Sequence, residues 1–82
     1  MPQDYQQSLH EAANNYTIKI EYDGNNNPIY IGKAKVGTLT TDALWQIQKL
    51  TFTGTNPTNI QWANGNDDFL NIWDNRTGLS YS

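Results

Sequence analysis

The stretch YTIKIEYDGNNNPIYIGKAKV, residues 16–36, decides the fold, because a segment of alternating apolar and polar side chains leads through a turn sequence into a second strand candidate. In residues 16–22 Tyr or Ile occupies every second position, which is the pattern of a β-strand with one buried face. The segment DGNNNP, residues 23–28, favours a loop. Residues 29–36 follow as a second strand, in which Gly32 indicates a bulge or a close backbone approach. The sequence therefore predicts a β-hairpin.

A second hairpin is predicted from residues 44–63. The longest strand candidate, residues 44–53, changes its apolar phase between Ile47 and Leu50. That change indicates a bulge near residues 48–49, or a strand buried on both faces. A turn sequence over residues 54–58 leads to the partner strand at 59–63. The following Asn64-Gly65 is a strong turn dipeptide, and we expect Gly65 in the left-handed conformation.

The two ends of the chain show helical spacing. Residues 3–14 carry Tyr5, Leu9 and then Ala12 or Ala13 on one side, which predicts a short amphipathic helix. Residues 67–76 are predicted to form a second helix, with the two aspartates at 67–68 at its N-terminus. Arg76 is expected to pair with a carboxylate or to stack on an aromatic ring. Residues 79–81 are expected to form a terminal strand or an anchoring tail.

These elements predict a mainly β fold, a small antiparallel barrel or sandwich of two hairpins with short N-terminal and C-terminal helices. We expect residues 1–15 to be a helical or extended contact segment and residues 16–82 to be the β domain. The apolar positions of the predicted elements give the expected core: Ile18, Ile20, Ile31, Trp45, Ile47, Leu50, Phe52, Ile60, Trp62, Phe69, Ile72 and Trp73.

The composition sets limits on the function. With 82 residues the chain forms one domain, and a core of this size is marginal by itself. There is no Cys, so disulfides cannot reinforce the core, and this favours oligomerisation. A net charge of −3 and scattered basic residues argue against nucleic acid as a partner. The sequence lacks a long apolar run and a signal-like start, so we expect no membrane contact and synthesis in a cytoplasm.

No pattern in the sequence predicts catalysis, a metal or a cofactor. His10 has no partners arranged by a known motif, so a surface position is expected. Asp23, Asn25 and Asn27 resemble the start of a calcium-binding loop, but Ala34 stands at the twelfth position, where a carboxylate is required. A turn is the better interpretation. We therefore expect no enzymatic activity.

Carbohydrate binding is the alternative interpretation of the aromatic residues. The faces of Tyr22, Tyr30, Trp45 and Trp62 could stack on sugars, and an Asn-rich loop lies between the first two. A chain this small needs most of its large aromatic side chains for its core, so the core interpretation is preferred.

From Tyr30 onward the chain resembles a group of small proteins encoded in tailed-bacteriophage genomes. The resemblance lies in five short motifs: Tyr30-Ile31-Gly32, Gly37-Thr38, Trp45-Gln46-Ile47, Trp62-Ala63-Asn64-Gly65 and Trp73-Asp74-Asn75-Arg76. Val36 departs from the pattern, which often has Pro before Gly-Thr. The motifs consist of glycine, tryptophan and aliphatic positions, and they transfer no catalytic residue.

The resemblance implies a virion protein present in many copies, either a capsid-decoration subunit or a neck or tail adaptor. Its partners would be other virion proteins and further copies of itself. The apolar residues outside the predicted core are the expected partner contacts: Tyr5, Leu9, Leu79 and Tyr81. Two other functions stay open, a carbohydrate-binding module of a phage fibre or tail tip and a small intracellular phage inhibitor.

Overall fold

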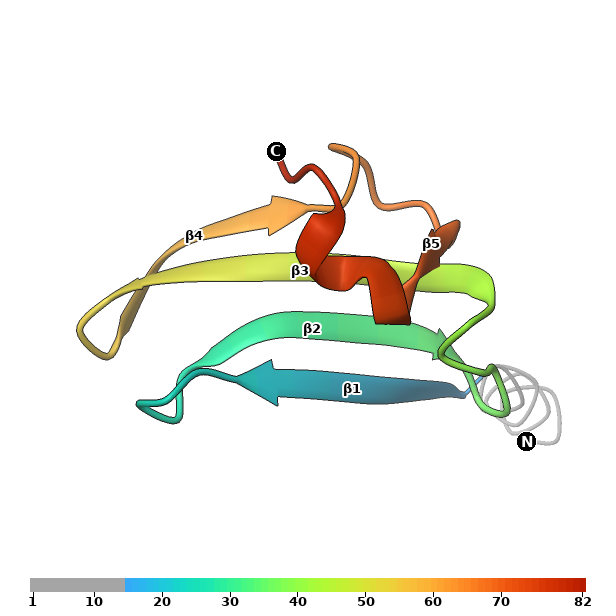
Figure 1. Ribbon diagram of the computed structural model, residues 1–82, viewed down its shortest axis with the longest axis horizontal. Helices are drawn as coiled ribbons and strands as arrows, with labels where there is room; N and C mark the ends of the chain where they lie inside the picture. The colour runs from blue at the N-terminus through green and yellow to red at the C-terminus, as the bar shows by residue number, and fades with distance from the viewer. Residues whose placement is uncertain (1–14) are drawn as a thin grey trace, which may run out of the picture.

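A computed structural model describes residues 15–82 as one antiparallel sheet followed by a short helix (Figure 1). The four long strands neighbour one another in chain order, and a short fifth strand also pairs with β3. The predicted mainly β, antiparallel architecture is confirmed. The elements are β1 (Tyr16–Tyr22), β2 (Pro28–Lys35), β3 (Ala43–Thr53), β4 (Asn56–Trp62), β5 (Asn71–Ile72) and the 3-10 helix η1 (Trp73–Gly78).

The first hairpin joins β1 to β2 in the register that pairs Ile20 with Ile31. Its loop is organised by Asp23, whose Oδ1 accepts hydrogen bonds from the backbone N–H groups of Asn25 and Asn27, at 2.8 and 3.0 Å. The Asn27 side chain is buried and donates to the carbonyl of Gly54 at 2.9 Å, in the loop of the second hairpin. The two hairpin loops are therefore tied together at one end of the sheet.

The second hairpin joins β3 to β4, and both predicted hairpins are confirmed. β4 begins at Asn56, three residues before the predicted strand, and it includes Pro57. Pro fits there because β4 is an edge strand. Alternate N–H groups of an edge strand point away from the sheet, so a residue without an N–H group is tolerated at such a position. The bulge in this hairpin falls between Thr51 and Phe52, slightly beyond the predicted position.

The core lies on one face of the sheet, between β2, β3 and the C-terminal segment. The rings of Trp45 and Trp73 lie 5.9 Å apart between centroids, and Trp45 Nε1 donates to the Leu39 carbonyl at 2.9 Å. A Cβ atom on Gly32 would stand 2.5 Å from the Trp73 ring, so the predicted close approach at this glycine is confirmed. The buried apolar residues are Tyr30, Ala34, Trp45, Ile47, Ala63 and Trp73.

The C-terminal helix was predicted wrongly in position and type. Residues 67–70 form a loop, and the helix is a 3-10 helix that begins at Trp73. The reason is Asn71, whose buried side chain donates to the Trp45 carbonyl at 3.2 Å and accepts from Asn64 Nδ2 at 2.8 Å. These contacts hold residues 71–72 as a strand beside β3. The Asp68 N–H bonds to the side chain of Asn66 in the loop, so the aspartates cap no helix.

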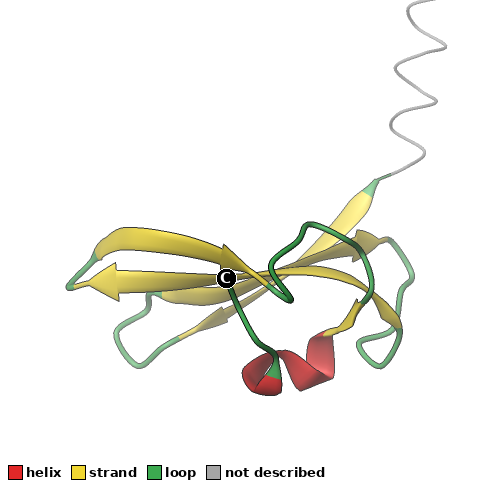
Figure 2. Ribbon diagram, turned by 90° about the horizontal axis from the view of Figure 1, so that it is seen from above, coloured by secondary structure: helices red, strands yellow, loops and turns green. Residues whose placement is uncertain are grey.

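The last residues form the predicted anchoring tail. Trp62 and Ser82 exchange both backbone hydrogen bonds, at 2.9 and 3.1 Å, and Ala63 pairs with Tyr81. The tail thereby returns to β4 after η1. Figure 2 shows η1 lying on one side of the sheet. Within residues 15–82, no helix is long and apolar enough to cross a membrane. Residues 1–14, and with them most of the predicted contact segment, lie outside the described residues.

The predicted core was too large, because it drew on both faces of the sheet. Ile18, Ile20 and Ile60 are exposed, although they were expected inside. Their side chains lie on the face opposite the core, where the loop of residues 67–70 contacts Gln46 and Tyr16. Of the nine other expected core residues, three are buried and six are partly exposed. The buried ones are Trp45, Ile47 and Trp73, and the partly exposed ones are Ile31, Leu50, Phe52, Trp62, Phe69 and Ile72.

Candidate functional site

The candidate site is the second face of the sheet, opposite the core, which we call the open face. The strand register places one row of side chains across it: Ile20 pairs with Ile31, Ile31 with Gln48, and Gln48 with Trp62. Because side chains alternate between faces along a strand, every second residue joins this row on the same side. The open face so defined carries apolar and polar side chains. The apolar ones are Tyr16, Ile18, Ile20, Tyr22, Ile31, Leu50, Ile60 and Trp62, and the polar ones are Lys33, Lys35, Gln46 and Gln48.

The apolar side chains at the two edges of the open face are about half exposed. Ile18 is 50% exposed, Tyr22 55% and Ile60 53%, and these residues lie on the two edge strands. Single exposed apolar side chains are ordinary, but contiguous ones mark an interaction site, and along β1 Tyr16, Ile18, Ile20 and Tyr22 form such a row. The described residues thus present a surface that another apolar surface could cover.

One end of the open face is hollowed into a shallow pocket of about 380 Å³. The Tyr16 and Phe69 rings stack there with centroids 5.7 Å apart, and Lys33 Nζ lies 4.5 Å above the Tyr16 ring. Phe69, which was predicted in the core, therefore packs at the rim of the open face. The pocket is lined by Tyr16, Lys35, Thr38, Leu44 and Phe69.

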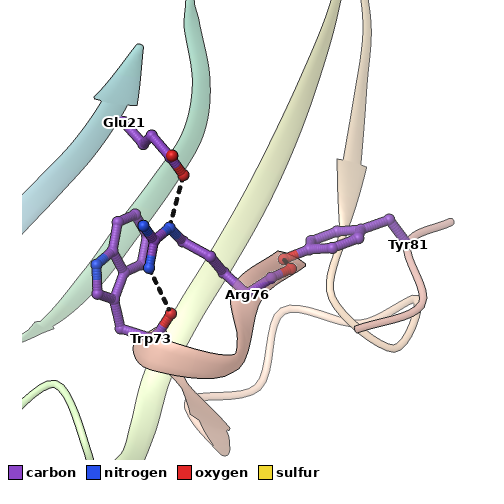
Figure 3. Close-up of polar contacts among 4 residues, drawn as sticks. All are labelled: Glu21, Trp73, Arg76 and Tyr81. Carbon is purple, nitrogen blue, oxygen red and sulfur yellow. Dashed lines mark hydrogen bonds and ion pairs between the residues drawn. The ribbon is translucent and has the colours of Figure 1, made fainter. Parts of the chain in front are cut away.

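On the opposite face, Arg76 connects η1 to the edge strand β1 (Figure 3). Its Nε donates to Glu21 Oε1 at 2.7 Å, and its guanidinium carbon lies 4.6 Å from the Trp73 ring centroid. Both expected contacts of Arg76, with a carboxylate and with an aromatic ring, are therefore present. Arg76 Nη1 also donates to the Trp73 carbonyl at 3.1 Å. These contacts are structural, because they fasten the C-terminal segment to the sheet.

Leu79 and Tyr81 were predicted as partner contacts, but they pack against the chain's own core. The Tyr81 hydroxyl donates to the Arg76 carbonyl at 2.8 Å, and its ring lies 5.8 Å from that of Tyr30. Burial, with a further contribution from Tyr30, raises the pKa of Tyr81 to about 12, and Arg76 partly opposes this shift. The two other predicted contacts, Tyr5 and Leu9, lie outside the described residues.

The loop that resembles a calcium site is organised as a turn. The N–H groups of Asn27 and Asn25 bond to the Asp23 carboxylate and lower its pKa. The Asp23 carboxylate therefore accepts hydrogen bonds from the backbone of its own loop and stabilises the turn. Across residues 15–82, no group of three or more acidic or His side chains is placed to hold a metal ion.

The alternation in residues 16–22 revealed the apolar side chains of β1, but it was interpreted as core. A sequence shows that one face of a strand is apolar, and it does not show which layer covers that face. The covered face of the sheet instead carries small residues of β2: Gly32 lies against the two indole rings, and Ala34 is fully buried in the same core. That signal was present in the sequence as the small side chains of residues 32 and 34.

Comparison of the chain with models of protein families, with curated proteins and with solved structures gave no match.

Proposed function

We propose that this chain is a non-enzymatic structural subunit of a bacteriophage particle, present in many copies. It contacts neighbouring virion proteins through the open face of its sheet. The observation that carries the proposal is the exposure of Ile18, Ile20 and Ile60 on one face of the sheet. Because apolar area exposed to water is unfavourable, covering this face in an assembly stabilises the subunit.

The phage assignment rests on the resemblance of residues 30–81 to small proteins of tailed phages. Several of the positions that carry this resemblance are packing positions in the structure. Gly32, Trp45 and Trp73 form one close contact, and Ala63 is fully buried beside them. The shared pattern thus describes a rigid scaffold, whose use depends on the surface that it presents. Capsid decoration and a neck or tail adaptor are the two places that suit such a subunit.

The direct test is mass spectrometry of particles purified from the phage whose genome encodes this sequence. The expected result is the chain at many copies per particle. Its absence from the particle would contradict the proposal and would favour a small intracellular inhibitor.

A variant pair tests the part played by the open face. Ile60→Glu places a charge on the open face at a side chain that is already 53% exposed, and we expect it to reduce incorporation. Val36→Glu is the matched control, because Val36 is 68% exposed in the turn after β2. Equal incorporation of the two variants would show that the open face makes no contact in the particle.

A carbohydrate-binding module is the second candidate, and one observation favours it. Tyr22 is exposed on the open face and directly precedes the Asn-rich loop. Against it, Tyr30 and Trp45 are buried and cannot stack on a sugar. Saturable binding of host polysaccharide that is lost in Tyr22→Ala and retained in Val36→Ala would support this candidate.

A further inference from the structure

The two edges of the sheet differ in how their backbone groups are used. At the β4 edge, Trp62 bonds to Ser82 and the Asn64 N–H donates to the Ser80 carbonyl at 2.7 Å. Pro57, near the other end of β4, has no N–H group to offer. β1 contains no proline, and none of residues 15–82 pairs with its outer edge. An edge strand of this kind is a template for pairing with another strand.

The hydrogen bonds of the first hairpin show which backbone groups of β1 point away from β2. The Val36 N–H donates to the Asn15 carbonyl at 3.3 Å, and the Asp23 N–H donates to the Asn27 carbonyl at 2.9 Å. Odd-numbered residues of this strand therefore turn their backbone groups toward β2. In an antiparallel ladder the residues between them turn theirs the opposite way. The outer edge of β1 thus offers the N–H and C=O groups of Tyr16, Ile18, Ile20 and Tyr22.

The side chains of β1 select among the possible partners of this edge. Lys19 and Glu21 lie on the face that carries the core, and Ile18, Ile20 and Tyr22 lie on the open face. A partner strand must therefore be apolar at alternate positions and carry both charges between them. β1 of a second copy has this pattern.

Charge also selects the register. If two β1 strands are centred on Ile20, Lys19 of each copy lies opposite Glu21 of the other. If they are centred on Lys19, the two lysines oppose each other, which is unfavourable. In the register centred on Ile20, the outward-facing backbone groups of Ile20 in one copy meet those of Ile20 in the other copy. The backbone groups of Ile18 in each copy meet those of Tyr22 in the other. Glu21 bonds Arg76 through Oε1, and its second oxygen can accept from a lysine.

We propose that two copies of this chain pair along β1 in an antiparallel arrangement centred on Ile20. The pairing joins the two sheets into one and makes the two open faces continuous. The contact is a two-fold one, and it closes because the other edge of each sheet is interrupted by Pro57 and the C-terminal tail. The inference extends the proposed function, since it names the contact between copies of the assembly subunit.

The first experiment measures the mass of the full chain by sedimentation equilibrium over a range of concentrations. The wild-type chain is expected to dimerise. Lys19→Glu and Glu21→Lys each place like charges opposite each other twice in the pair, so each is expected to raise the dimer dissociation constant about tenfold or more. A mixture of the two variants restores opposite charges at both positions and is expected to form the heterodimer. A mixture that dimerises no better than its components would overturn the proposal.

Glu21→Lys also removes the ion pair with Arg76, so a second experiment leaves the charges in place. The chain has no Cys, which allows single-cysteine variants to report the register. Residues that face each other in a hydrogen-bonded antiparallel pair have Cα atoms about 5.5 Å apart, which suits a disulfide. Ile20→Cys is therefore expected to form a cross-linked dimer on mild oxidation. Ile18→Cys is the matched control, because residue 18 faces residue 22 and its two copies lie too far apart.

Every outcome bears on the pairing itself. Stronger cross-linking of Ile18→Cys than of Ile20→Cys would overturn the register, and cross-linking of neither would overturn the pairing. A monomeric full chain whose Ile20 amide resists hydrogen exchange would assign the edge to the chain's own residues 1–14. The proposed function is tested separately, because the chain can dimerise without entering a particle and can enter one as a monomer.

Discussion

Glu21 and Arg76 form a 2.7 Å ion pair that joins strand β1 to the 3-10 helix across 55 positions of sequence. The pair lies on β1, at one edge of the sheet formed by residues 15–82. Arg76 also lies over the Trp73 ring, so one side chain links an edge strand, a helix and the core. The four residues of this junction are drawn in Figure 3.

The first prediction separates the two contacts of Arg76. Glu21→Gln removes the charge of a partly exposed pair and is expected to lower the free energy of unfolding by only about 0.5 kcal/mol. Arg76→Ala also removes the stacking on Trp73 and the apolar stem of the side chain, so a loss of about 1–2 kcal/mol is expected. Urea denaturation of the two variants measures both values. A larger loss for Glu21→Gln than for Arg76→Ala would contradict this assignment.

The second prediction concerns the close approach at Gly32. A Cβ atom there would stand 2.5 Å from the Trp73 ring and 3.1 Å from that of Trp45. Neither ring can move freely, because both are buried against β2 and β3. Gly32→Ala is therefore expected to destabilise the fold by about 2 kcal/mol through overpacking.

Gly24→Ala is the matched control for Gly32→Ala. A Cβ atom on Gly24 would meet no atom within 4 Å. The free energy of unfolding is expected to change by less than about 0.5 kcal/mol. Thermal denaturation followed by circular dichroism compares the two substitutions, and similar midpoints would show that the space beneath Trp73 is larger than described.

The third prediction is a dependence of stability on alkaline pH. The pKa of Tyr81 is raised to about 12 in the folded chain, chiefly by burial, from a usual value near 10. The fold thus favours the neutral phenol. This contribution to stability is fully present below pH 10 and is lost as the pH rises from about 10 to about 12.

Tyr81→Phe tests the assignment of this pH dependence. The substitution removes the hydrogen bond to the Arg76 carbonyl and is expected to cost about 1 kcal/mol at neutral pH. The difference in stability between the wild-type chain and the variant should then shrink as the pH is raised above 10. Urea titrations at several pH values measure it, and a constant difference would argue against ionisation of Tyr81 in this range.

The strands were predictable because their signals are local. Alternation in residues 16–22 and the turn chemistry of residues 23–28 lie within one hairpin, and both hairpins formed as expected. The C-terminal helix was misplaced because the contact that decides it is distant. Asn71 bonds the carbonyl of Trp45, 26 residues away, and helical spacing within residues 67–76 carries no information about that bond.

The candidate site could be predicted only in part, for a related reason. The apolar positions of β1 and β4 were recognised, but burial depends on the layer that covers them. The C-terminal segment could have packed on either face of the sheet. Gly32 and Ala34 provide room for Trp73 on one face, and on the other face Ile31 and Lys33 fill the corresponding positions of β2. The difference between the faces became visible only when the side chains of three elements were placed together.

The last prediction tests the distinction between the two faces directly. Ile47 and Ile60 are the same residue type on adjacent strands, and the sequence placed both in the core. Ile47 is only 1% exposed on the covered face, and Ile60 is 53% exposed on the open face. Ile47→Ala is therefore expected to lower the free energy of unfolding by about 3 kcal/mol, since it leaves a cavity among buried side chains. Ile60→Ala is expected to lower it by less than about 1 kcal/mol at concentrations where the chain is monomeric. Urea denaturation at low protein concentration makes the comparison, with the slope of the transition as a check that both variants unfold from the same state. Equal losses would mean that another part of the chain covers the open face.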